Sequence, residues 1–158
     1  MRITQLFRKK KTKNENAVNY IIKKYKTNDN IIYIFDKTKE MFIIQEGQVA
    51  IEKVHQGVHL RLKVLEKGQF FGEMSLMEGL PRSATARALT KTHLLVLSSG
   101  SFLMKLRRDP TFAFEIINQL CHRIRATDEH LIQLITEAKI SPQVAQELLS
   151  QSDLNIKS

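Results

Sequence analysis

The 158-residue chain has little of several residue types, and each shortage excludes a class of protein. Its single cysteine, Cys121, has no partner for an internal disulfide, which is typical of a protein from a reducing cytoplasm. The longest apolar runs, such as residues 31–35 and 94–97, have the length of strands and are too short for a membrane span. No apolar stretch follows the basic residues 8–13, so we expect no signal peptide. The composition is that of a globular protein of one domain with short appendages.

Acidic residues are scarce in the first part of the chain. Residues 1–26 hold nine Lys and Arg against one acid, whereas the remainder is nearly neutral, so the formal charge of +9 is concentrated at the N-terminus. The high pI is therefore no sign of a nucleic-acid-binding face on the body. Residues 8–13 are able to contact acidic lipid or nucleic acid, but a solvated basic tail over residues 1–14 is the favoured interpretation.

Short apolar runs separated by turn residues fill the middle of the chain. They predict six strands over residues 31–35, 41–44, 48–53, 59–65, 83–88 and 93–97. Many short strands at regular spacing suggest a closed β-roll. Before them, Val18, Ile21, Ile22 and Tyr25 recur at helical spacing and predict a short amphipathic helix over residues 15–26.

Helical patterns follow the strands. Phe102, Leu103 and Leu106 predict a short helix that ends at Asp109, and Pro110 is suited to the first position of the next helix. No Gly or Pro occurs from there to Ile140, so a helix is expected over residues 110–140. A last helix is expected over residues 143–150, with Ser141 as its cap.

The stretch from Phe71 to Ala86 carries the strongest functional signal. It reads as a strand end, a glycine turn, one short helical turn and then Arg82-Ser83-Ala84 entering another strand. N–H groups at a helix start attract an anion, and a guanidinium binds one through a forked hydrogen bond. The Glu73 carboxylate suits a pair of neutral hydroxyls instead. The pattern therefore predicts a ligand with an anion beside a ribose-like diol, the alternative being an ordinary β-turn with a surface arginine.

This string resembles the phosphate-binding cassette of cyclic-nucleotide-binding domains, whose pattern is Phe-Gly-Glu, a few apolar positions and then Pro-Arg-Ser-Ala. The resemblance implies that Glu73 binds the ribose 2′-hydroxyl and Arg82 the cyclic phosphate. It places further phosphate contacts at Gly72, Met74, Ser75, Ser83 and Ala84, with Phe71 and Leu62 in support.

The resemblance covers roughly residues 27–140 and implies an α+β fold: a double-stranded, jelly-roll-like β-roll with flanking helices and a long C-terminal dimerisation helix. Two departures occur near its start. Asn28-Asp29 and Asp36-Lys37 stand where the family usually has Gly-Asp. Asn and Asp tolerate a left-handed backbone better than other non-glycine residues, so we expect both turns to form.

The long helix carries a heptad seam. Apolar residues and one threonine follow alternating spacings of three and four, the pattern of a two-stranded coiled coil. The seam consists of Ile117, Leu120, Ile124, Thr127, Leu131, Leu134 and Ala138. We expect a homodimer through residues 112–138. The alternative is a helix packed only on its own roll, for which Ile116, Ile132 and Ile135 would serve.

Thr127 is the polar member of this seam. Taken alone, its hydroxyl would bond back to the carbonyl of Arg123. Residues 123–129, however, resemble the dimer helix of bacterial catabolite activator proteins, which implies base recognition by Thr127 and pairing of Arg123 with Glu73. Asp128 stands where those proteins usually have a serine that reaches the partner subunit's ligand, and it is able to accept from an adenine amine.

The expected ligand is cAMP rather than cGMP, since cGMP-selective members place Thr directly after the cassette arginine, where this chain has Ser83, and since Thr127 matches the adenine-reading arrangement of the family. A cyclic dinucleotide and a domain without ligand are weaker alternatives. Catabolite activators carry a DNA-reading helix-turn-helix after the long helix, and these 158 residues include no recognition helix. We therefore expect either a sensor that signals to an unknown protein partner or the sensor portion of a DNA-binding regulator, over domain boundaries of 1–14, 15–140 and 141–158.

Other chemistry finds little support. His55 and His59 lack the spacing and the acidic partner of a metal set, so no metal is expected. Cys121 is expected to be a small buried residue. Nucleophile-elbow, Walker-type and paired-carboxylate patterns are absent from the sequence, and we expect no enzymatic activity.

Overall fold

The computed structural model describes residues 3–4, 19–141 and 143–147. The chain divides into two compact units, Met1–Ile116 and Ile117–Ser158, and each is described by itself. The predicted basic tail over residues 1–14 falls almost entirely outside the described residues. Ile3 is fully buried.

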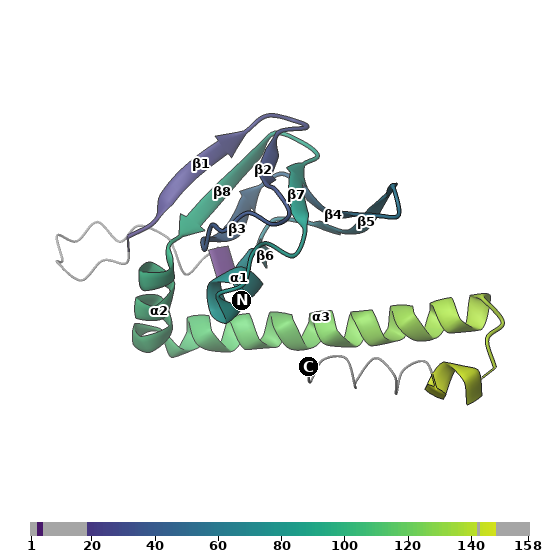
Figure 1. The fold of residues 1–158 in the computed structure, drawn as a ribbon. Helices are drawn as coiled ribbons and strands as arrows, with labels where there is room; N and C mark the ends of the chain where they lie inside the picture. The colour runs from purple at the N-terminus through teal and green to yellow at the C-terminus, as the bar shows by residue number, and fades with distance from the viewer. Residues whose placement is uncertain (1–2, 5–18, 142, 148–158) are drawn as a thin grey trace. The chain divides into compact units, whose positions relative to one another are not determined.

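Two four-stranded antiparallel sheets form the body of the first unit (Figure 1). The strands of one sheet, in spatial order, are β1 (Ile21–Tyr25), β8 (Thr92–Leu97), β3 (Met41–Glu46) and β6 (Phe70–Phe71). Those of the other are β2 (Asn30–Ile32), β7 (Thr85–Ala88), β4 (Val49–His55) and β5 (Val58–Leu65). With the flanking helices, this arrangement confirms the predicted α+β class.

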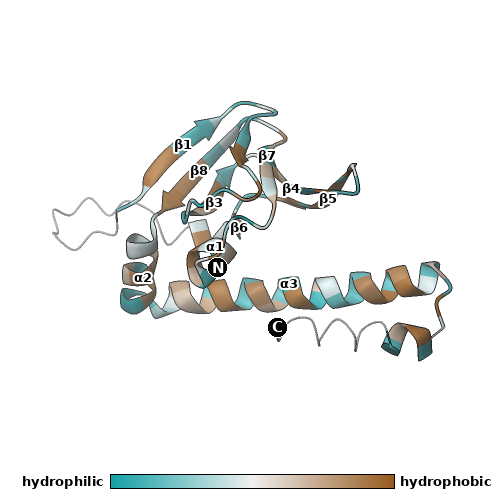
Figure 2. Cartoon of the chain, in the orientation of Figure 1, coloured by the Kyte–Doolittle hydropathy of each residue, from teal (hydrophilic) through white to brown (hydrophobic). Residues whose placement is uncertain are grey.

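The two sheets share one core, because apolar side chains alternate to the inner face of each strand. Phe42 and Val96 come from the first sheet, and Val49 and Ala86 from the second, and all four are at most 2% exposed. Burial of a side chain the size of Val or Phe contributes about 1.5–3 kcal/mol. Figure 2 shows the same strands in brown where their residues are apolar. This core holds the ends of β6 and β7 in place, and those ends flank the segment singled out by sequence.

The labelled helices are α1 (Glu73–Glu78), α2 (Ser99–Arg108) and α3 (Pro110–Glu137). Pro110 opens α3 as predicted, and Asp109 caps it, since its Oδ1 accepts from the Phe112 N–H at 3.0 Å. Burial opposes ionisation of Asp109, but hydrogen bonds from Lys105 and the Phe112 N–H outweigh it and lower its pKa. The start of α3 is therefore firmly anchored in the first unit.

In the second unit α3 carries an exposed apolar stripe, which Figure 2 shows as recurring brown bands. Ile117, Ile124 and Leu131 are 58%, 62% and 40% exposed. The helix ends at Glu137, three residues before the predicted end, because Lys139 turns left-handed at φ 54 and the Ile140 N–H bonds to the Ile135 carbonyl.

A short helical turn over residues 143–147 follows. Ser141 Oγ accepts from the Val144 N–H at 3.4 Å, so the predicted cap is in place. Residues 148–150 of the predicted last helix lie outside the described residues.

Several sequence predictions need correction. Residues 21–25 form strand β1 and not a helix, because pairing with the apolar strand β8 overrides the helical spacing of Ile21, Ile22 and Tyr25. The strand expected over 31–35 stops at Ile32, since Phe35 adopts a left-handed backbone at φ 72. Asn28 is left-handed as expected, but at the second turn Phe35 takes this conformation in place of Asp36.

Cys121 is exposed, not buried as predicted, because the buried side chains of α3 are Phe112 and Ile116, which both lie before it on the helix. Within the described part of the chain, no helix combines the length and the sustained hydropathy of a membrane span.

Candidate functional site

The segment between β6 and β7 folds back so that its two ends meet. Gly72 begins it with a left-handed backbone (φ 82), which lets the chain turn from β6 directly into α1. Arg82 Nη1 donates to the Gly72 carbonyl at 2.9 Å. Ser83 Oγ lies 3.8 Å from Met74 Sδ. The structure thus brings together the glycine turn and the arginine that the sequence placed in one site.

Gly72 has no room for a side chain. A Cβ there would lie 2.7 Å from the Glu40 carbonyl oxygen and 2.8 Å from Arg82 Nη1. The left-handed backbone also disfavours any residue with a Cβ. Glycine at this position is therefore required both by the turn and by the close approach of Arg82.

Arg82 is a buried cation at the centre of this arrangement. Only 2% of the residue is exposed. Its Nε donates to Thr38 Oγ1 at 3.1 Å, and its guanidinium carbon lies 5.7 Å from the centre of the Phe42 ring. Burial lowers the pKa of the guanidinium, and the carboxylates of Glu40, Asp36 and Glu73 offset part of this shift.

The backbone of Arg82 is held as firmly as its side chain. Its N–H donates to the Asp36 carbonyl at 2.8 Å, and its carbonyl accepts from the Phe35 N–H at 2.9 Å. Thr85 Oγ1 accepts from the Ile34 N–H at 3.1 Å. These hydrogen bonds thus link the turn after β2 to the start of β7 around the arginine.

The other predicted residues of this segment are distributed between core and surface. Glu73 opens α1 and is 7% exposed, and Ser75 is 3% exposed. Met74 is 49% exposed, Ser83 is exposed and Ala84 is half-buried. The carboxylate of Glu73 is close enough to Arg82 to influence its pKa.

The two supporting residues differ in burial. Phe71 is buried and stacks on Phe42 with ring centres 5.0 Å apart, so it fixes the strand from which Gly72 turns. Leu62 is 53% exposed on β5.

The residues predicted to read a base lie in the second unit. Thr127 Oγ1 donates to the Arg123 carbonyl at 2.8 Å, so the local back-bond considered from sequence is present. Thr127 and Asp128 are exposed, and Arg123 is half-buried. Because they belong to the second unit, they remain predictions as members of the site.

Sequence reasoning missed Thr38, Glu40 and Phe42, which surround the Arg82 guanidinium. They lie about forty positions before Arg82: Thr38 and Glu40 just before β3, and Phe42 within it. No local motif marks them, since only the pairing of β3 with β6 brings this strand beside the cassette.

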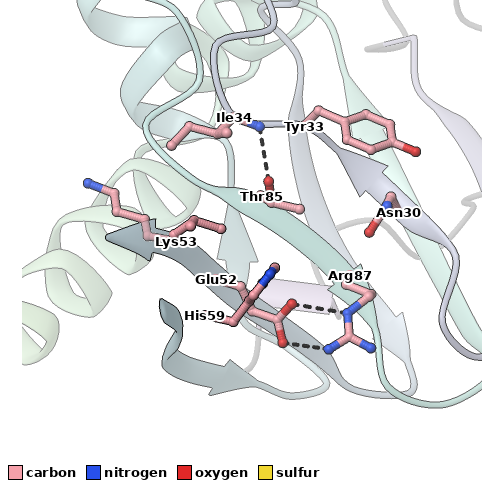
Figure 3. A pocket seen from close by; sticks show the side chains of 9 residues that line it. Asn30, Tyr33, Ile34, Glu52, Lys53, His59, Thr85 and Arg87 are labelled. Atoms are coloured by element: carbon pink, nitrogen blue, oxygen red, sulfur yellow. Dashed lines mark hydrogen bonds and ion pairs between the residues drawn. The ribbon is translucent and has the colours of Figure 1, made fainter. Parts of the chain in front are cut away.

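A second feature is a hollow of about 460 Å³ on the other face of the second sheet, shown in Figure 3. Ala86 and Ala88 face the core, so Thr85 and Arg87 on the same strand face this hollow. Arg87 binds Glu52 through two hydrogen bonds of 2.7 and 3.0 Å, and these bonds lower the pKa of Glu52. The ion pair links β7 to β4, and neither of its two residues is a predicted site residue.

Among the described residues, no three His, Cys, Asp or Glu side chains gather as a metal site would require. His55 and His59 lie exposed at the β4–β5 hairpin.

Comparison with known proteins agrees with this geometry. The family model described as the cyclic nucleotide-binding domain matches residues 22–109, more than half of the chain. The cyclic AMP receptor protein of Thermus thermophilus is 35% identical over 102 residues, which span 64% of this chain and 47% of that protein. The cAMP-activated global transcriptional regulator of Salmonella typhimurium is 29% identical over 131 residues, which span 82% of this chain and 62% of that protein.

Among solved structures, the catabolite activator protein of Thermus thermophilus superposes with a TM-score of 0.65 and 32% identity, over 73% of this chain and 55% of that chain. The chain thus spans about half to three fifths of the length of the relatives described above.

Proposed function

Because the chain belongs to the cyclic nucleotide-binding domain family, we propose that it is a receptor module for a cyclic nucleotide, with cAMP preferred over cGMP. The observation that carries this proposal is the buried Arg82 held against the Gly72 turn. A guanidinium that is already desolvated and oriented binds an anion without a large ordering cost. The names of the relatives, a cyclic AMP receptor and a cAMP-activated regulator, support the same ligand class.

The proposed roles follow the chemistry of the residues. Arg82 binds the cyclic phosphate together with Ser83, Ala84 and the N–H groups of Gly72, Met74 and Ser75. Glu73 accepts from the ribose 2′-hydroxyl, because a carboxylate accepts hydrogen bonds and repels phosphate. Phe71 and Leu62 support the site through packing. Arg123 is proposed to pair with Glu73 when the long helix engages the ligand.

The preference for cAMP rests on Thr127. A hydroxyl has one hydrogen, and that of Thr127 is donated to the Arg123 carbonyl. Its oxygen then offers only lone pairs, which accept from the 6-amine of adenine but repel the 6-carbonyl of guanine. Asp128, an acceptor when ionised, adds to the same preference.

We further propose that two chains pair through the heptad seam of α3. The seam residues Ile124 and Leu131 are exposed to water, and a partner helix would bury them. A second copy of the chain offers the same heptad repeat. Ligand binding would favour the arrangement in which the long helix engages the purine, and this population shift is the signal passed to a protein partner. The exposed thiol of Cys121 suits the reducing cytoplasm.

A second function is favoured by the relatives, one of which is named as a transcriptional regulator and is covered over 62% of its length. In this alternative the chain is the sensor portion of a regulator that reads DNA through a separate domain. A gel-shift assay of the native full-length protein with random duplex DNA separates the two functions: a regulator with a separate DNA-reading domain is expected to shift the duplex, whereas a sensor alone is expected to leave it unshifted.

Titration calorimetry with cAMP and cGMP tests the proposed function. The wild-type chain is expected to bind both, cAMP more tightly, and Arg82→Ala is expected to weaken cAMP binding by about 2–4 kcal/mol. Arg107→Ala removes the same charge from an exposed position on α2 and serves as the control. Wild-type affinity in a folded Arg82→Ala variant would contradict the assignment.

A further inference from the structure

We propose that Glu40 sets the ligand affinity of this site, because its carboxylate faces Arg82 and competes with the ligand phosphate for the guanidinium. This inference rests on the proposed function and adds to it a residue that lies outside the cassette. It depends on three features of the structure: the unused donors of Arg82, the position of Glu40 and the difference in exposure between them.

The first feature is the incomplete hydrogen bonding of Arg82. Nε donates to Thr38 Oγ1 and Nη1 donates to the Gly72 carbonyl. Nη2 is buried and has no hydrogen-bond partner within the described residues. It lies 3.7 Å from Glu40 Oε2, which is close enough for an ion pair but beyond hydrogen-bond distance. One arm of the guanidinium thus has an acidic neighbour and remains able to donate to a better placed acceptor.

The second feature is the fixed position of the Glu40 backbone. Glu40 directly precedes β3, and its carbonyl oxygen lies 2.7 Å from the point where a Cβ on Gly72 would be. The chain therefore passes directly over the start of the cassette at this residue. Its carboxylate lies beside the same guanidinium that would meet a phosphate.

The third feature is the difference in exposure, which decides which of the two side chains moves when a ligand arrives. The Arg82 side chain is 1% exposed, whereas that of Glu40 is 36% exposed. Glu40 can rotate into water at little cost, but Arg82 cannot. An arriving phosphate would therefore either displace the carboxylate or share the guanidinium with a like charge, and both routes weaken binding.

The electrostatics of Arg82 point the same way. Burial lowers the pKa of its guanidinium, and among the carboxylates that oppose this shift Glu40 contributes most, ahead of Asp36 and Glu73. Glu40 thus stabilises the cation in the ligand-free protein. By linkage, whatever stabilises the ligand-free form against the bound form reduces the affinity.

The test compares Glu40→Gln with the wild-type chain by titration calorimetry with cAMP and by thermal unfolding without ligand. We expect Glu40→Gln to bind cAMP about fivefold more tightly, the lower end of common coupling between sites. We also expect its unfolding midpoint without ligand to fall, since Arg82 loses its counter-charge. Glu40→Asp keeps the charge but withdraws it from Nη2, so an intermediate gain in affinity is expected there.

Glu78→Gln is the matched control. It removes the same charge from an exposed position at the end of α1, and its affinity for cAMP is expected to stay at the wild-type value. Unchanged or weaker binding in both Glu40 variants would overturn this inference alone. If the wild-type chain bound neither cAMP nor cGMP, the proposed function would fall and this inference with it.

Discussion

The Thr127 hydroxyl donates a hydrogen bond of 2.8 Å to the backbone carbonyl of Arg123, one turn earlier on α3. The carbonyl can only accept, so the direction of this bond is fixed, and the Thr127 oxygen faces outward as an acceptor. From the sequence, this back-bond was the alternative to base recognition. In the structure the same bond leaves the Thr127 oxygen as an acceptor, which favours a base that carries an amine, such as adenine.

Replacement of Thr127 by alanine is expected to reduce the preference for cAMP over cGMP by about tenfold, or about 1.4 kcal/mol, because one hydrogen bond to the adenine amine is lost. Thr127→Ser keeps the hydroxyl and should keep most of the preference. A competition assay with both nucleotides measures the ratio.

The control for this prediction is Thr136→Ala. Thr136 makes the same back-bond, to the Ile132 carbonyl at 2.9 Å, and lies further along the same helix. Its replacement should leave the ratio unchanged. An unchanged ratio in Thr127→Ala would exclude Thr127 from base recognition.

Gly72→Ala is expected to destabilise the protein and to abolish tight ligand binding. The new Cβ would meet the Glu40 carbonyl and Arg82 Nη1 at less than 3 Å in addition to the strain of φ 82. Gly57→Ala has nearly the same backbone (φ 78) but nothing within 4 Å of the new Cβ, so it should cost only the strain of about 1–2 kcal/mol. Chemical denaturation measures both costs, and equal values would argue against a tight contact at Gly72.

Leu131→Glu is expected to convert a dimer into a monomer, since it places two like charges in the proposed seam. Ile132→Glu introduces the same charge at the neighbouring position, which is 65% exposed and lies outside the seam. That variant should remain dimeric. Sedimentation velocity distinguishes the two states, and a wild-type chain that is monomeric at all concentrations would contradict the pairing.

Phe35→Gly is expected to stabilise the protein by about 0.5–1 kcal/mol, because a bulky residue at φ 72 carries strain that glycine does not. The Phe35 ring is 75% exposed, so little packing is lost. The hydrogen bond from its N–H to the Arg82 carbonyl is retained. The unfolding midpoint should rise by about 2 °C.

Tyr33→Gly removes an exposed aromatic ring two positions earlier, where the backbone is not left-handed. It should lower the midpoint, because glycine there only adds freedom to the unfolded chain. A fall of the midpoint in Phe35→Gly would show that the exposed ring stabilises the turn.

Much of the fold was predictable because it follows local periodicity and turn chemistry. The strands that became β3, β4, β5 and β8, and the start of α3 at Pro110, were all located within about three residues. The error at β1 arose because an edge strand with Ile21, Ile22 and Tyr25 also fits helical spacing. Only its pairing with β8, about seventy residues later, makes this segment a strand and not a helix.

The site residues divide in the same way, into those set by a local motif and those set by contacts between distant segments. Gly72 and Arg82 were found because they share one short motif, and the structure joins them directly. Glu40 was missed, since its relation to Arg82 exists only after β3 pairs with β6. Phe35 was missed for another reason: nothing in its residue type suggests a left-handed turn, which tertiary hydrogen bonds to Arg82 impose.

The six residues of α1 lie between two glycines, Gly72 and Gly79, both with left-handed backbones. Arg82 is hydrogen-bonded both to the Gly72 carbonyl and to the turn after β2, so the Gly72 end of α1 is held in place. Adjustment of α1 to a ligand would then be largest at the Gly79 end, and the amide protons there should exchange with deuterium faster than those of β7. Ligand binding would thus order one end of a helix whose other end is already fixed.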